Sequence, residues 1–293
     1  MGIIIGIFEE GMVYAILALG VLITYRILDF PDLTVDSSFP LGAAVSAKLT
    51  VDGMHPVLTL FIAILAGALA GLMTGLIHVK GKVRDLLSGI IMMTMLYSVN
   101  LRIAGRANLP FFNLETLLDN AFVKGFPAFL APYSKIIIIF TVLVFAKVFL
   151  DLFLKTKAGY LLRAVGDNPH VVATLAKDAG IVKIQGLVIA NALVALAGAV
   201  MAQKNRFFEI SIGTGAIVFG LAAVIIGINL FKNLTWMKLT TAAILGSIIY
   251  KACVSLALSL GLAAQDLKLV TGALFLIILI TGGLYRKKVK FHA

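Results

Sequence analysis

Apolar runs of about 20 residues recur along this chain, and short polar intervals separate them. A helix of that length crosses the hydrocarbon core of a bilayer. Since 61% of the residues are hydrophobic and 13% are charged, a soluble globule could not cover its apolar surface with polar groups. We therefore expect an all-α, polytopic integral membrane protein that forms a single transmembrane domain over residues 1–293.

The runs predict about nine crossings, one of them broken. They lie at residues 11–28, 29–49, 56–79, 86–104, 133–154, 184–203, 213–231, 239–260 and 267–285. If the broken second run does not cross, eight spans remain and the N-terminus changes sides. The external interval 105–131 is long enough for a re-entrant or interfacial helix.

Basic residues gather in four places that even numbers of crossings separate. These are Lys80, Lys82 and Arg84; the interval 155–183; Lys232 and Lys238; and the tail from Arg286 to Lys290. This is the positive-inside pattern, so these places and the C-terminus are expected in the cytoplasm of a bacterial-type plasma membrane. The net charge of +11 then indicates contact with anionic lipid headgroups, with no nucleic-acid partner.

The broken run at 29–49 is the first candidate for the lining of a transport pathway. Polar, interrupted helix at membrane depth is tolerated only where protein or a water-filled cavity surrounds it. If Pro31 starts a helix, Asp32 and Asp36 lie one turn apart and could meet an ammonium group. Alternatively, Asp32 lies at the cytoplasmic headgroups. The candidates in this run are Asp32, Asp36, Ser37, Ser38, Phe39 and Pro40.

Polar residues also close the fourth run, at its outer end. Arg102 and Arg106 are four residues apart on one expected helix face, where they could attract a carboxylate. Asn100 joins them as a candidate for the pathway. The alternative is that the arginines anchor lipid phosphates or an external binding protein.

The interval 155–183, called the hook below, predicts two short amphipathic helices. The first occupies residues 159–165 and ends at Gly166, since glycine enters the left-handed conformation of a helix end without steric cost. The second runs from Asn168, an N-cap, with Pro169 in its first turn, to Gly180. Such a hook either packs on its own subunit or docks a partner.

Motifs for chemistry are missing from the sequence. The nearest approach to a phosphate loop, at Lys80 to Val83, lacks both the first glycine and the Ser or Thr that would hold magnesium. The histidines are scattered and have no partners at metal-ligand spacing. We therefore expect no cofactor, no metal and no enzymatic activity, which leaves transport or a channel.

Glycines at 67, 71 and 75 form two overlapping GxxxG patterns in the third run. Such patterns let two helices approach closely. Packing inside the subunit is the default interpretation, and dimerisation through this face is the alternative.

Four blocks resemble one known family, in order along nearly the whole chain. They are YRILDFPDLTVDSSFPLGAA at 25–44, SVNLRIAGRANLP at 98–110, GYLLRAVGDNP at 159–169 and GLAAVIIG at 220–227. The chain resembles permease subunits of ATP-binding-cassette importers, within them the branched-chain amino-acid permease family, and most closely its tryptophan/tyrosine transport branch. Ser37 stands where that family has glycine, and Ile228 and Asn229 stand where an acidic residue is expected.

The resemblance implies partners and a role for the hook. A cytoplasmic coupling helix would dock on ATPase subunits, an extracytoplasmic binding protein would deliver an amino acid, and two permease copies would form one pathway. The coupling residues that the resemblance implies are Gly159, Leu161, Leu162, Arg163, Val165, Gly166, Asp167, Asn168, Pro169, Val171 and Leu175. Of these, either Leu161, Leu162 and Val165 or Val171 and Leu175 would form the apolar contact. Arg163, Asp167 and Asn168 would form its rim.

An ion-gradient-driven secondary transporter is the main alternative, because it would also contain broken helices and buried aspartates. That class is often built of two inverted repeats with matching interruptions. Here the sequence predicts no second break around 180–230. A scaffold or channel subunit without coupled transport is a third possibility.

Overall fold

A computed structural model of the chain describes residues 2–120, 123, 125, 133–168, 178–234, 236–259, 269, 271–273 and 275–277. The elements, in chain order, are α1 (Gly2–Val21), η1 (Leu22–Ile27), α2 (Val35–Val51), α3 (Pro56–Val79), α4 (Asp85–Ala104), β1 (Asn108–Pro110), α6 (Ser134–Phe153), α7 (Lys157–Asp167), α9 (Ala179–Asn205), β2 (Phe207–Glu209), η3 (Ile210–Gly213), α10 (Ala216–Phe231) and α11 (Leu239–Ser259).

Seven helices within the described residues are long and apolar enough to cross a membrane. With α2, which has 17 residues, they account for the first eight expected crossings. The ninth, at 267–285, lies mostly outside the described residues. The all-α polytopic fold is confirmed.

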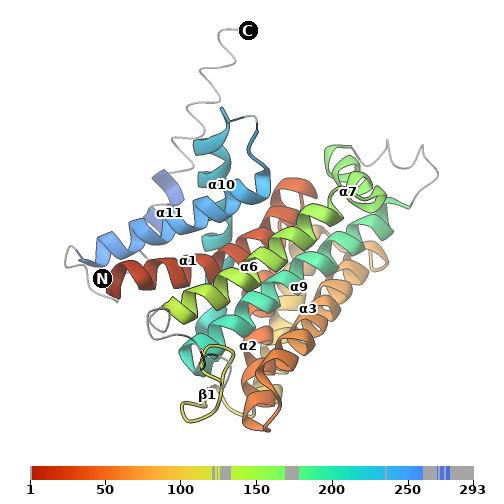
Figure 1. Cartoon of the computed structure of the whole chain (residues 1–293). Helices are drawn as coiled ribbons and strands as arrows, with labels where there is room; N and C mark the ends of the chain where they lie inside the picture. Colours follow the sequence, from red (N-terminus) through yellow and green to blue (C-terminus); the bar gives the residue numbers. More distant parts are fainter. Residues whose placement is uncertain are drawn as a thin grey trace.

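The bundle has two distinct ends (Figure 1). The hook helix α7 lies at one of them, the hook end, and β1 lies at the other, the strand end, where it pairs antiparallel with β2. Ile27 at the end of η1 contacts Gly166 of α7, and Val79 at the end of α3 contacts Gly180 of α9. Both α1 and α3 therefore run toward the hook end, so the broken segment between them does traverse the bundle.

The external interval 105–131 differs in part from the expected re-entrant or interfacial helix. Its described residues 105–120 form β1 and an isolated bridge between Thr116 and Asp119, and they contain no re-entrant helix. Part of the remaining interval, including residues 126–131, lies outside the described residues.

Helix α9 is the centre of the core and packs against α1, α2 and α3. The glycines of α3 face it: a Cβ on Gly67 would overlap Asn191 and Ala195, and one on Gly71 would overlap the carbonyl of Leu187. Only glycine permits backbones to approach so closely. The GxxxG face therefore packs against α9 of the same subunit, which confirms the default interpretation.

Helix α2 is enclosed by protein, as a polar helix at membrane depth must be. Thirteen of its 17 residues are buried, and its neighbours are α3, α4 and α9. It starts at Val35, however, and not at Pro31. Asp32 therefore precedes the helix, where its Oδ1 accepts a hydrogen bond from the Thr34 amide at 3.0 Å.

Candidate transport site and hook

Residues 206–215, called the second interruption below, connect the two crossings α9 and α10, where the sequence leaves a gap between the expected runs 184–203 and 213–231. Arg206 has a left-handed φ of 58° and ends α9, and Gly215, with φ 85°, precedes α10. Between them the chain forms β2 and η3.

The second interruption packs on α2 through Gly213. A Cβ on Gly213 would overlap the Asp36 carbonyl oxygen and the ring of Pro40. Proline has no amide hydrogen, so Pro40 cannot bond the carbonyl four residues before it, which is that of Asp36. The proline in α2 thus creates the surface on which the second interruption lies.

The carboxylate of half-buried Asp36 completes this contact by capping α10. Its Oδ1 accepts from the Ile217 amide at 2.8 Å and its Oδ2 from the Gly215 amide at 3.2 Å. The first amides of a helix have no partner within the helix, and that end carries a partial positive charge. Asp36 therefore neutralises the start of α10 in this arrangement.

Asp32 is only 1% exposed and lies in a different network. Its Oδ2 accepts from Asn191 Nδ2 at 2.8 Å, and Ser38 Oγ donates to Asn191 Oδ1 at 2.7 Å. The expectation that Asp32 and Asp36 lie one turn apart on one helix is wrong, because Asp32 precedes α2 and the two side chains bind separate elements. Asn191 was not predicted; it stands as an isolated polar residue in the apolar run 184–203.

The remaining candidates of the broken run are also buried. Ser37 Oγ donates to the Met93 carbonyl at 2.8 Å, and Asn100 Nδ2 donates to the Ser37 carbonyl at 3.0 Å, which joins α2 to α4. Buried Phe39 stacks on Tyr14, with ring centroids 6.0 Å apart, and Tyr14 stacks in turn on Phe219. The aromatic contacts link α2 to α1 and α10.

Asn100 has an unusual oxygen. Its Oδ1 is buried and has no hydrogen-bond partner within the described residues. An unpaired buried acceptor costs free energy, and Thr116 Oγ1 is the other buried side-chain atom without a partner within the described residues.

The outer arginines do not lie on one helix face. Helix α4 ends at Ala104, and Gly105 at its C-cap has φ 74°, so Arg102 is in the helix and Arg106 is beyond it. Both are exposed. The arginine that organises the strand end is Arg206, which pairs with Asp119 and donates to the Phe112 carbonyl at 2.7 Å.

The first hook helix is confirmed, but it is longer than expected and Gly166 does not end it. Thr156 Oγ1 caps α7 by accepting from the Gly159 amide at 3.3 Å, and the helix continues to Asp167. A Cβ on Gly166 would overlap the Ile27 carbonyl oxygen. The glycine therefore allows α7 to lie directly on η1.

The apolar side of α7 faces its own subunit. Leu162 and Val165 are 0% and 1% exposed and belong to the main core, and Leu161 packs partly against it. Leu162 and Val165 therefore cannot form the predicted apolar contact with a partner. Buried Gly159 lies against the Phe153 carbonyl.

The opposite side of α7 is open. Tyr160 is 61% exposed, and Arg163, Asp167 and Asn168 are exposed with it. Pro169, Val171 and Leu175, together with the predicted second hook helix, lie outside the described residues.

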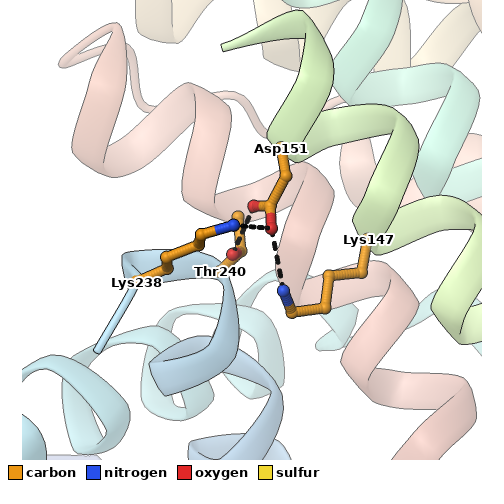
Figure 2. Close-up of polar contacts among 4 residues, drawn as sticks. All are labelled: Lys147, Asp151, Lys238 and Thr240. Atoms are coloured by element: carbon orange, nitrogen blue, oxygen red, sulfur yellow. Dashed lines mark hydrogen bonds and ion pairs between the residues drawn. The ribbon is translucent and has the colours of Figure 1, made fainter. Parts of the chain in front are cut away.

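A polar clasp next to the hook was not predicted (Figure 2). Asp151 near the end of α6 accepts from Lys147 at 2.8 Å and from Lys238 at 3.0 Å through Oδ2. Its Oδ1 accepts from Thr240 Oγ1 at 2.6 Å. Since α7 follows α6 after a short turn, this clasp joins the base of the hook to the start of α11.

Membrane-crossing helices that enclose a polar helix and carry a hook at one end are typical of a polytopic membrane transport protein. The chain belongs to the family described as branched-chain amino acid transport system / permease component, whose model matches residues 3–279. It is a permease of an ATP-binding-cassette transport system.

Relatives cover almost the full chain. A tyrosine transport system permease protein of Clostridioides difficile (strain R20291) is 44% identical over 96% of this chain and 92% of its own length. An uncharacterized protein of Rickettsia prowazekii (strain Madrid E) is 34% identical over 94% and 96%. A probable branched-chain amino acid transport permease protein of Methanocaldococcus jannaschii is 25% identical over 85% and 87%. No solved structure matches the chain significantly.

Proposed function

We propose that this permease imports an aromatic amino acid of the tyrosine or tryptophan type. The supporting observation is the 44% identity, over 96% of the chain, to a tyrosine transport system permease. Relatives named for ribose import and for nucleoside transport share only 24% and 27% identity over shorter stretches. The aromatic solute is accordingly the best-supported one.

Two copies of the chain form the pathway at their interface, and separate subunits hydrolyse ATP. The cytoplasmic ATPases dock at the hook end, and a solute-binding protein docks at the strand end. The exposed side of α7, with Tyr160, Arg163 and Asp167, is the docking face for the ATPase. The chain itself has no catalytic role.

Contacts of the hook support a lever mechanism. Leu162 and Val165 fix α7 to the core, and Gly166 places it on the backbone of Ile27. A push on α7 is transmitted to η1 and then to the segment 28–34 that precedes α2. The second interruption, 206–215, then moves with α2, since Asp36 and Gly213 connect it to that helix. Movement of these two interruptions opens the pathway on alternate sides.

The experiment is uptake by the complete transporter in vesicles, with permease, ATPase and binding protein reconstituted together. We expect concentrative uptake of labelled tyrosine or tryptophan that requires ATP, with leucine and ribose as comparison solutes. Uptake driven by a proton gradient without ATP would overturn the mechanism. ATP-driven uptake of leucine or ribose but not of aromatic amino acids would overturn the solute.

A further inference from the structure

A basic pocket of about 370 Å³ lies at the hook end, between the turn after α3 and the first turns of α9. Its lining combines two chain segments more than 90 residues apart. The lining residues are His78, Val79, Lys82, Val83, Arg84, Ala179, Gly180 and Lys183. The function proposed above does not use this pocket.

Four of the eight lining residues are basic and none is acidic. No ion pair joins Lys82, Arg84 or Lys183 to a carboxylate within the described part of the chain, whereas Lys147, Lys204, Lys238 and Lys251 are all paired there. Unpaired cations that share one concave site attract an anion.

The nearby carboxylates are already engaged. Asp178 Oδ1 accepts from the Gly180 amide at 2.7 Å and caps α9, and Asp85 Oδ1 accepts from the Leu86 amide at 2.9 Å at the start of α4. Both belong to helix starts on either side of the pocket. They reduce its positive charge without filling it.

Contacts of His78 join the two sides of the pocket. His78 Nδ1 lies 2.8 Å from the Val83 carbonyl, and Phe30 packs edge-on against the imidazole ring with centroids 5.1 Å apart. Lys183 Nζ lies 3.4 Å from His78 Nε2. Lys82 has a left-handed φ of 52°, which is rare for a residue with a Cβ and is commonly retained at functional sites.

We propose that this pocket binds the phosphate of an anionic phospholipid headgroup from the membrane leaflet at the hook end. Phosphate is the anion that suits several Lys and Arg donors in one concave site. The membrane is the favoured source because Arg84 leads into α4, whose Leu86 and Leu87 are 45% and 49% exposed and offer a surface for acyl chains. Basic pockets between membrane helices bind anionic headgroups in this way.

The bound headgroup bridges α3 and α9 immediately beside the hook. Lys82 and Arg84 approach it from the turn after α3, and Lys183 approaches it from α9. An anionic lipid would therefore hold together the two helices whose glycine contact forms the centre of the core.

The test is native mass spectrometry of the purified full-length permease, titrated with phosphatidylglycerol or with phosphatidylcholine. We expect retention of phosphatidylglycerol over phosphatidylcholine. The double variant Lys82→Gln/Arg84→Gln should lower the phosphatidylglycerol affinity by at least about tenfold, and Lys183→Gln by about fivefold. The control Lys80→Gln/Lys155→Gln removes the same charge from exposed positions that do not line the pocket, and should change the affinity less than twofold.

Three outcomes would overturn the proposal. The first is equal loss in the control and the pocket variants, which would indicate general surface attraction. The second is competition by millimolar inorganic phosphate with the same affinity as the lipid, which would indicate a site for free anions. The third is unchanged lipid binding with loss of ATPase co-purification, which would make the pocket a protein-docking site. Thermal unfolding of each variant, followed in the same detergent, checks that it is folded.

Discussion

Asn191 of α9 donates a hydrogen bond from Nδ2 to the buried Oδ2 of Asp32 over 2.8 Å, across 159 positions of sequence. The bond connects the centre of the bundle to the segment between η1 and α2. Through Ser38, which donates to the same amide, it also reaches α2 itself. Three elements thus depend on one side chain for their relative positions.

Replacement of Asn191 by leucine should destabilise the permease by about 2 to 3 kcal/mol, because Asp32 and Ser38 each lose a buried hydrogen-bond partner. Thermal unfolding in detergent measures the effect. Gln185→Leu is the matched control, since Gln185 is exposed on the same helix and should shift the midpoint little. Equal shifts for both variants would show that Asn191 has no special role.

Asp36→Ala should lower stability by about 1 to 2 kcal/mol, since the amides of Gly215 and Ile217 lose their cap. Asp36→Asn keeps an acceptor oxygen and should retain most of the stability. Unfolding midpoints are measured beside the KM of ATP-driven uptake. If Asp36→Asn instead raised KM tenfold at unchanged stability, the carboxylate would be a solute contact rather than a cap.

Gly166→Ala should displace α7 from η1, because the new methyl group overlaps the Ile27 carbonyl. Overpacking of this kind costs about 1 to 3 kcal/mol. We expect ATP-driven uptake to fall severalfold in reconstituted vesicles. Gly6→Ala is the control, since a Cβ at Gly6 meets nothing within 4 Å. Normal uptake by Gly166→Ala would show that the close contact of Gly166 with Ile27 is not needed to transmit movement from α7 to η1.

Arg163→Glu should weaken binding of the ATPase by about tenfold or more, because it reverses a charge at the centre of the exposed face of α7. Co-purification with the cognate ATPase is the measurement, and Lys155→Glu, in the turn before α7, is the control. Unchanged binding and uptake would remove Arg163 from the docking face.

Asp151→Asn should destabilise the contact of α6 with α11 by about 1 to 3 kcal/mol, since Lys147 and Lys238 lose their common carboxylate (Figure 2). The Asp151 side chain is 13% exposed, whereas both members of the Lys48–Asp52 pair are more than 40% exposed. Asp52→Asn should therefore cost about 1 kcal/mol at most. The unfolding midpoints of the two variants are compared. A larger decrease for Asp52→Asn than for Asp151→Asn would contradict the prediction.

Helices that one apolar run defines could be predicted closely. The run 56–79 coincides with α3 (Pro56–Val79), because Pro56 can occupy the first turn and no charged residue interrupts the run. The first hook helix was predicted two residues short at each end, since its Thr156 cap was missed and Gly166 was interpreted as a stop.

Contacts between distant segments could not be predicted. Asp36 was predicted to line the pathway, but its partners at Gly215 and Ile217 are about 180 positions away and are backbone amides, which no residue type reveals. The clasp at Asp151 is likewise a contact between distant segments, because Lys238 and Thr240 lie at the start of α11. Amphipathicity also did not decide whether Leu162 and Val165 contact their own subunit or a partner. It identifies the apolar side of a helix but not what covers that side.

The glycine row of α3 constrains how protomers can assemble. Since α9 of the same chain already fills the face at Gly67, Gly71 and Gly75, no second protomer can approach there without separating the two helices. The quaternary contact therefore has to use other surfaces of the subunit.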